Sequence, residues 1–191
     1  MHENVYHINY ELETSYWWFV ARNKIVLSLL KRFASLSKGD TVLDVGCGTG
    51  GFASLLASQY DVLCLDTSPL AIEYCRKRGL NNVFLMPLQD FPGENHNIRA
   101  IFFLDVIEHI DDDYSVLARA REILSSKGYL VITVPAYRWL WSRHDEIHMH
   151  KRRYTRQQLK ELLLALNFDV KFISYFNSFL FLLFRVFKGQ A

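Results

Sequence analysis

One short segment constrains the fold of this chain more than any other: the apolar run Thr41–Val45 followed directly by a glycine-rich turn. A run of this length with β-branched residues is typical of a strand buried on both faces. Glycines stand at alternate positions after it, at 46, 48 and 50, and a helical pattern begins at Phe52. Glycines let a backbone approach a ligand closely, and the helix amino terminus attracts negative charge. The segment therefore predicts the first strand–turn–helix unit of a parallel sheet, with a ligand site at the turn.

Apolar runs and helical patterns alternate along the rest of the chain, which is typical of an α/β protein. We predict a doubly wound, Rossmann-like, mostly parallel sheet in three layers. The predicted strands are Thr41–Val45, Asp61–Leu65, Asn82–Met86, Arg99–Leu104, Tyr129–Val134 and Phe168–Ser174. The predicted helices are Ser15–Phe33, Phe52–Ser58, Ser68–Arg78, one from Asp112 or Asp113 to Ser125, and Thr155–Leu166, which opens with a capping box.

Composition narrows the class of protein. A chain of 191 residues with 50% hydrophobic residues suits one domain with a sizeable core. Its net charge of +2 gives no argument for binding nucleic acid. Cys47, Cys64 and Cys75 lack the spacing of a zinc site, so we expect buried, reduced thiols. Neither a secretory signal nor a spanning apolar run is evident, which favours a cytoplasmic protein.

Two carboxylates flank the glycine turn in the predicted fold. Asp44 precedes Gly46 by two residues, and a carboxylate at that place suits a ligand with a positive charge. Asp66 ends the second strand, where a carboxylate can accept hydrogen bonds from both hydroxyls of a ribose. Its alternative role is to cap the next helix, which does not exclude the first.

Three motifs together carry a resemblance to a known family: Val-Leu-Asp44-Val-Gly-Cys-Gly-Thr-Gly50, Leu-Asp66-Thr-Ser and Leu104-Asp-Val-Ile-Glu-His109. Over residues 15–175 the chain resembles the class I S-adenosylmethionine-dependent methyltransferases, and within them the group of quinone-biosynthesis O-methyltransferases. The resemblance implies S-adenosylmethionine as cofactor, S-adenosylhomocysteine as product and a small-molecule methyl acceptor.

The resemblance also implies where the cofactor binds. Asp44 and the glycine turn would hold its methionine end and Asp66 its ribose. Either Leu88 or Gln89, or Asp90 after a small shift, would lie near the adenine. Arg22 would pair with the cofactor carboxylate. Trp17 and Trp18 would lie in the same helix above the cofactor, although core packing explains at least one of them equally well. The full set of predicted cofactor residues is Trp17, Arg22, Asp44, Gly46, Cys47, Gly48, Gly50, Asp66, Thr67, Leu88, Gln89 and Leu104.

One candidate for chemistry is the set Asp105, Glu108 and His109, whose spacing would place them on one helical face. In the quinone O-methyltransferases a similar set is associated with a divalent metal, and carboxylates with imidazole bind Mg²⁺, Mn²⁺ or Zn²⁺. The alternative, which we favour, is that Glu108 and His109 brace the helix. No metal is therefore expected, and His109 remains a candidate base.

A second candidate is the run 141–154, which follows the fifth strand and resembles a His-Asp…His-x-Arg-Arg-Tyr-Thr run of the same methyltransferase group. His144 and His148 would share a helical face, and either is a candidate general base. The run predicts a lid that binds the acceptor, and its basic residues would suit an anionic one. A solvated basic loop is the alternative. The predicted acceptor-binding residues are Asp145, Arg152, Arg153 and Tyr154.

We expect a single methyltransferase domain over residues 1–191. It would comprise a cap helix region (1–38), a cofactor-binding core (39–135), an acceptor lid with the sixth strand (136–175) and an apolar carboxyl-terminal segment (176–191). The class I fold has a seventh, antiparallel strand, and no residues remain to form it. The apolar segment would pack within the protein, in a homodimer interface or at a membrane interface.

The predicted function is methylation of a small molecule, with oxygen of a lipid-like, quinone-like or glycan-related acceptor as the target atom. Two alternatives stay open. Gly46-x-Gly48-x-x-Gly51 also fits a nicotinamide-dependent oxidoreductase, against which Asp44 argues. The third interpretation is a non-catalytic protein that binds the cofactor on the same scaffold.

Overall fold

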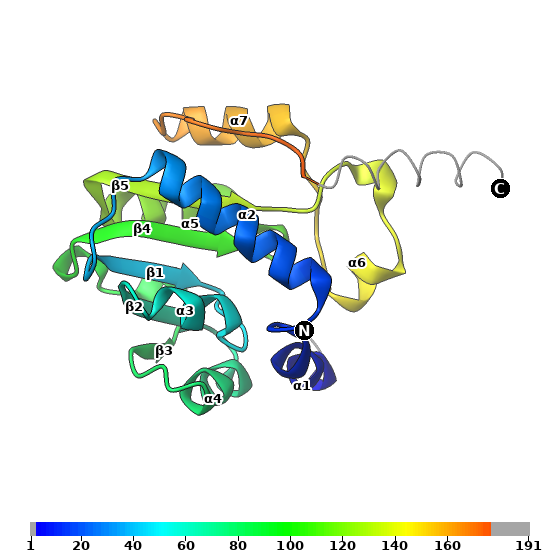
Figure 1. Cartoon of the computed structure of the whole chain (residues 1–191). Helices are drawn as coiled ribbons and strands as arrows, with labels where there is room; N and C mark the ends of the chain where they lie inside the picture. The colour runs from blue at the N-terminus through cyan, green and yellow to red at the C-terminus, as the bar shows by residue number, and fades with distance from the viewer. Residues whose placement is uncertain (1–2, 177–191) are drawn as a thin grey trace.

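A computed structural model describes residues 3–176, and its centre is a parallel sheet of five strands in the order β3-β2-β1-β4-β5. Figure 1 shows the strands with helices on both sides. The strands are β1 (Thr41–Val45), β2 (Asp61–Asp66), β3 (Val83–Leu85), β4 (Ile98–Leu104) and β5 (Leu124–Thr133). The α/β class, the parallel sheet and five of the predicted strands are thereby confirmed.

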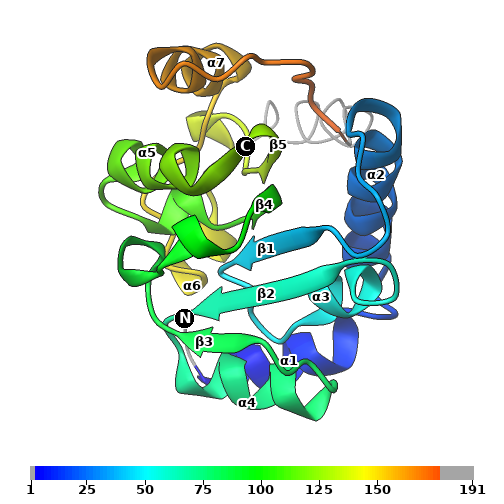
Figure 2. The same ribbon diagram turned by 90° about the vertical axis from the view of Figure 1, so that its left-hand side faces the viewer.

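The sheet divides the hydrophobic core into two clusters, and helices cover one cluster on each face. Figure 2 shows α2 and α3 on one side of the strands and α5 on the other. One cluster joins alternate β1 residues such as Val42 to α2, α3 and α4, and the other joins Leu43 and Val45 to α5 and α7. The three predicted layers follow from this alternation. The helices are α1 (Glu3–Leu12), α2 (Trp17–Phe33), α3 (Gly51–Leu56), α4 (Pro69–Lys77), α5 (Asp113–Ile123), α6 (Arg143–Ile147) and α7 (Arg156–Ala165).

The strand order reverses between β1 and β4, and this position fixes where a ligand can bind. From β1 the chain proceeds outward through β2 and β3, and then returns to the other side of β1 with β4 and β5. The connections after β1 and β4 therefore leave the sheet in opposite directions. A crevice outside the carboxyl ends of two such strands is the usual ligand site of doubly wound sheets.

The prediction of a sixth strand at 168–174 is wrong, because this stretch is irregular in the structure. Figure 1 shows it passing back along α7. Its apolar residues find side-chain partners without pairing to the sheet: Phe172 stacks on Phe33 of α2 with ring centroids 5.6 Å apart, and Phe168 and Ile173 pack against the core. The apolar segment 176–191 and the question of a seventh strand lie outside the described residues, apart from Phe176.

The amino-terminal region differs from prediction by one added helix. Helix α2 matches the predicted 15–33 closely, but α1 precedes it and packs on α4, where Tyr10 and Tyr74 lie with ring centroids 4.5 Å apart. The capping box of Thr155 and Gln158 at the start of α7 is confirmed. Within residues 3–176, we find no helix of the length and apolarity needed to span a membrane.

Candidate cofactor and acceptor site

The glycine loop, Gly46–Gly50, runs from the carboxyl end of β1 to α3 in a conformation that requires glycine. The φ angles of Gly46 and Gly50 are +66° and +79°, a region that side-chain-bearing residues rarely adopt. A Cβ atom on Gly46 would lie 2.7 Å from Cγ2 of Val106, and one on Gly50 would lie 2.9 Å from Sγ of Cys75. The loop is therefore pressed between β4's following turn and α4, with its backbone forming the surface.

Asp66 at the end of β2 links the glycine loop to the next helix. Its Oδ2 accepts a hydrogen bond from the backbone N–H of Gly48 at 3.0 Å, and its Oδ1 accepts one from the N–H of Ser68 at 2.8 Å. The backbone N–H of Thr67 also interacts with this carboxylate. A carboxylate offers about four acceptor positions, so Asp66 can organise the start of α4 and still accept a hydrogen bond from a ligand.

Asp44 is buried beneath the glycine loop, with 3% of its surface exposed. Burial raises the pKa of its carboxyl to about 8; the neighbouring Cys75 adds to this effect and Arg22 opposes it. A carboxyl in such a place is stabilised in its charged form by an added positive charge. The site therefore favours a ligand that brings an ammonium group.

Two residues of the amino-terminal region that we did not predict cover the glycine loop. Glu13 accepts hydrogen bonds from Thr49 Oγ1 at 2.6 Å and from the N–H of Gly51 at 2.8 Å. Burial raises the pKa of Tyr6, whose hydroxyl interacts with Ser68 close to Asp66. No local pattern distinguishes Glu13 from its exposed neighbours, so only the fold reveals this contact.

Arg22 of α2 reaches across the crevice to the carboxyl end of β4. It is 8% exposed, and its Nη1 donates to Asp105 Oδ2 at 2.7 Å, while Thr133 Oγ1 donates to the other oxygen at 2.9 Å. Asp105 lies in a turn with φ of +59°. The predicted helical face shared by Asp105, Glu108 and His109 is therefore wrong, because Asp105 is turned toward Arg22 and Thr133 and only residues 107–109 form a helical turn.

Four histidines, at 109, 144, 148 and 150, form a histidine cluster beside this turn. The rings of His144 and His148 lie 4.1 Å apart between centroids, which confirms that they share a face, and His109 lies 4.7 Å from His150. Burial, helped by neighbouring imidazoles, lowers the pKa of His109 and of His148 to about 4. Both are neutral at pH 7 and can accept a proton.

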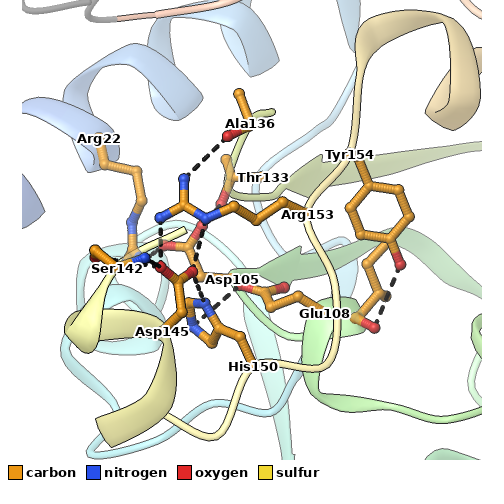
Figure 3. A network of polar contacts seen from close by, with 11 residues as sticks. Arg22, Asp105, Glu108, Thr133, Ala136, Ser142, Asp145, His150, Arg153 and Tyr154 are labelled. Carbon is orange, nitrogen blue, oxygen red and sulfur yellow. Dashed lines mark hydrogen bonds and ion pairs between the residues drawn. The ribbon is translucent and has the colours of Figure 1, made fainter. Parts of the chain in front are cut away.

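Asp145 holds the run 141–154 together, as Figure 3 shows. Its buried carboxylate accepts from Arg153 Nε and Nη2 at 2.7 and 2.9 Å, lies 2.9 Å from Nδ1 of His150, and accepts from Ser142 N–H at 2.8 Å. Arg153 also donates to the carbonyl of Ala136 at 2.9 Å. Although burial alone would raise the pKa of Asp145, these partners hold it well below its usual range. The lid is thus fixed by an internal ion pair.

Arg152 and the buried Tyr154 lie near the end of this run. An open hollow of about 300 Å³ is lined by both, with Asp113 and Leu162. Arg152 pairs with Asp113 at 3.0 Å, and Tyr154 donates to the same carboxylate at 2.6 Å. Much of the positive charge predicted for an anionic acceptor is therefore offset within the chain.

Glu108, His109 and His150 form the set that could hold a metal ion in the described part of the chain, since one ligand atom from each lies within 4.8 Å of the others. Glu108 is fully buried, and neither carboxylate oxygen has a hydrogen-bond partner among residues 3–176. Nε2 of His150 lies 4.0 Å from Oε1. Burial, with a contribution from Asp105, raises the pKa of Glu108 to about 9. The set differs from the predicted one in that His150 replaces Asp105.

The remaining predicted cofactor residues differ in their exposure to solvent. Trp17 is 52% exposed, and Thr67 and Gln89 are also exposed. Leu88 is 2% exposed and packs in the core beside α5, so Gln89 is the side chain of this pair that faces outward. Leu104 is nearly buried at the end of β4. The three thiols are free and buried, as expected.

Comparison with known families decides the class of this fold. A family model described as a methyltransferase domain matches residues 18–171. The chain belongs to the methyltransferase domain family. It is 27% identical over 146 residues to phosphoethanolamine N-methyltransferase 2 of Caenorhabditis elegans (71% of this chain, 33% of the relative). It is 29% identical over 135 residues to the ubiquinone biosynthesis O-methyltransferase of Xylella fastidiosa strain M23 (63% and 54%). The chain thus spans between a third and about half of these relatives.

Solved structures show the same fold. The methyltransferase domain superposes on the [4+2]-cyclase SpnF with a TM-score of 0.67 at 21% identity, covering 81% of this chain and 60% of that one. It superposes on a SAM-dependent methyltransferase of Thermotoga maritima with a TM-score of 0.62 at 24% identity, covering 86% and 82%. The class I methyltransferase fold predicted from the motifs is confirmed. Because one of these neighbours is a cyclase, the fold alone does not determine the reaction.

Proposed function

We propose that this domain is an enzyme that transfers a methyl group from S-adenosylmethionine to a small-molecule acceptor. The observation that carries the proposal is Asp66, whose carboxylate is oriented by Gly48 and Ser68 and retains acceptor capacity for a ribose hydroxyl. The buried carboxyl of Asp44 suits the amino group of the methionine end. Family membership over residues 18–171 supports the same conclusion.

When bound, the cofactor supplies an electrophilic methyl group on a sulfonium. The chain's own contribution is to bind, orient and exclude water. The glycine loop presents its backbone to the ligand, and Tyr6 of α1 and Glu13, which follows α1, cover that loop. Arg22, held by Asp105, brings a positive charge into the crevice that suits the cofactor carboxylate. Positioning of this kind supplies much of the rate enhancement in two-substrate reactions.

The histidine cluster supports a role in acceptor activation. It lies next to Asp105 at the carboxyl end of β4, on the opposite side of the strand-order switch from β2 and Asp66. His144, His148 and His109 remain the proposed bases, because a neutral imidazole can take the proton that an attacking hydroxyl or amine loses. An oxygen acceptor on a lipid-like, quinone-like or glycan-related molecule remains our proposal. The relatives named above include both an O- and an N-methyltransferase.

The test begins with binding. We expect calorimetric titration with S-adenosylhomocysteine to show one site, and titration with NADH to show none. Tight binding of NADH alone would replace the proposal with the oxidoreductase interpretation. The second step is incubation with S-adenosylmethionine carrying an isotope-labelled methyl group and a metabolite extract, followed by mass spectrometry for labelled products. Cofactor binding without any labelled product across such extracts would favour a non-catalytic binding protein.

A variant pair then tests the base. We expect the double variant His144→Ala, His148→Ala to retain affinity for S-adenosylhomocysteine and to lose labelled product at least about 100-fold, the usual range for a general base. The matched control is His96→Ala, because His96 stacks on Phe91 away from the cluster. Full activity of the double variant would remove both residues and leave His109 as the base to be tested.

A further inference from the structure

Two of the three cysteines meet at the glycine loop. Cys47 lies within the loop and Cys75 on α4, 28 positions later in the chain, and their Sγ atoms are 3.6 Å apart. Cys75 Sγ also donates to the carbonyl of Gly48 at 3.4 Å. Cys64 of β2 belongs to the same buried cluster and interacts with both thiols. Three sequence-distant segments therefore place their only cysteines together under the predicted cofactor site.

The glycine loop and α4 are in direct contact beside these thiols. A Cβ atom built on Gly50 would lie 3.3 Å from Cα of Cys75, so loop and helix touch at this point. A disulfide requires an Sγ–Sγ distance of about 2.0 Å, which a rotation of the thiols and a shift of about 1.5 Å would provide. Cys47 keeps 7% of its surface exposed, whereas Cys75 has none, so an oxidant would enter from the loop side.

We propose that Cys47 and Cys75 form a reversible disulfide that responds to peroxide and releases the cofactor by displacing the glycine loop. In the first step one thiolate attacks a peroxide oxygen; the O–O bond breaks, and a sulfenic acid and hydroxide form. In the second, the other thiol attacks that sulfur, the S–O bond breaks, and hydroxide leaves with the thiol proton as water. Two thiols and one hydrogen peroxide thus give one disulfide and two waters.

The electrostatic surroundings support reaction at this pair. The neighbouring thiols act as donors to Cys75, and with Arg78 they hold the pKa of Cys75 below its ordinary value, against the effect of burial. A thiolate is the reactive form of cysteine. Hydrogen bonding with Cys64 and with Cys75 raises the pKa of Cys47, whereas for Cys64 the lowering effect of Cys47 is outweighed by Cys75 and by burial.

The consequence for the site follows from what the loop holds. Formation of the bond draws Cys47 toward α4 and removes the S–H that the Gly48 carbonyl accepts. The N–H of Gly48 orients Asp66, so a shift of the loop also moves the acid proposed for the ribose. The disulfide itself is independent of the proposed function, whereas its effect on cofactor affinity rests on it.

The experiment compares reduced and peroxide-treated protein. We expect the treated protein to yield, after digestion without reductant, a cross-linked peptide that joins Cys47 to Cys75 and weighs two hydrogens less than the sum of its parts. Affinity for S-adenosylhomocysteine should fall at least about tenfold, and dithiothreitol should restore it. Cys64→Ala is the matched control and should still form the cross-link, whereas Cys75→Ala should not. The cross-linked peptide is mapped on the unmutated protein. The result therefore does not depend on whether a cysteine variant folds.

Thiols that stay unmodified after peroxide, or a cross-link that joins Cys64 in place of either partner, would overturn the proposal. So would a cross-link between Cys47 and Cys75 that leaves affinity unchanged. Failure of the reduced protein to bind S-adenosylhomocysteine would instead refute the proposed function, and the mapped peptide would still report on the disulfide.

Discussion

The two walls of the crevice are built in different ways. On the wall formed by β1 and β2, carboxylates bind backbone amides: Asp66 accepts from Gly48 and Ser68, and Glu13 from Gly51. On the wall formed by β4, β5 and α6, polar side chains bind one another, and the fully buried Glu108 has no hydrogen-bond partner within the described chain. The second wall therefore retains a buried carboxyl group without a hydrogen-bond partner among the described residues. Buried groups of that kind are expensive and are typically found at functional positions.

The largest expected effect comes from removing Asp145, which joins the polar side chains of the second wall. We expect Asp145→Ala to destabilise the protein by about 3–5 kcal/mol, because it leaves the guanidinium of Arg153 buried without its partner. Denaturation with urea, followed by circular dichroism, measures the change. Asp111→Ala is the matched control: Asp111 also pairs with a lysine of this run, Lys151, but its side chain is 85% exposed. A surface pair is worth about 0–1 kcal/mol, so equal losses in the two variants would contradict the assignment.

On the first wall, Asp66→Ala should weaken binding of S-adenosylhomocysteine by about 1–3 kcal/mol, or about 5- to 150-fold, since a charged hydrogen-bond partner is lost. Calorimetry measures the affinity. Asp61→Ala provides the control at the opposite, exposed end of the same strand, where Asp61 accepts only from Asn82. Unchanged affinity of the Asp66 variant would refute its role.

The pH dependence of binding sharpens the comparison further. The pKa of Asp44 in the free protein is raised to about 8 by burial, so its carboxyl carries a proton at neutral pH. A bound ammonium lowers that pKa, and binding therefore releases a proton. Affinity for S-adenosylhomocysteine should accordingly rise with pH by up to about tenfold per unit, and level off above pH 8.

Calorimetry in buffers of different ionisation enthalpy counts the released proton directly. Asp44→Asn should bind more weakly and should lose the pH dependence. A wild-type affinity that is constant between pH 6 and 8 would show that Asp44 does not change its protonation state on binding.

The smallest expected effect concerns Glu13, which covers the glycine loop on the first wall. Glu13→Gln should lower stability by about 1 kcal/mol, because two charge-assisted hydrogen bonds to Thr49 and Gly51 become neutral ones. Hydrogen exchange should accelerate in α1 before it does so in α3. Glu11→Gln, two residues earlier at the exposed end of α1, is the control and should change neither measurement.

The contrast between the walls also explains what the sequence predicts. Gly46, Gly48 and Asp66 act through backbone geometry within a few residues of each strand end, so their pattern is local and can be recognised in the sequence. The pairings of Asp145 with Arg153 and His150 are local as well. The sequence alone did not determine which histidine pairs with Asp145, because three histidines lie within five residues of it. Spacing favoured His144 and His148, whereas the fold gives His150 the carboxylate partner.

Contacts over long sequence distances were beyond prediction. Asp105 is 83 residues from Arg22, and no periodicity in the sequence records their ion pair. The same holds for Glu13, which meets Gly51 across 38 residues. The segment 168–174 has the composition of a strand, but side-chain stacking on Phe33 provided a competing way to bury its aromatic residues. Tertiary packing decided each of these cases.

The grip of Glu13 on the start of α3 has a kinetic consequence. Because the carboxylate of Glu13, just after α1, binds Thr49 and Gly51, we expect a molecule covered by this segment to leave when the amino-terminal segment lifts away. Dissociation of a spent cofactor then depends on the opening rate of a helix, which belongs to the microsecond-to-millisecond range of lid motions. The turnover rate of such an enzyme is then limited by the opening of this covering segment, which lies away from the reacting bond.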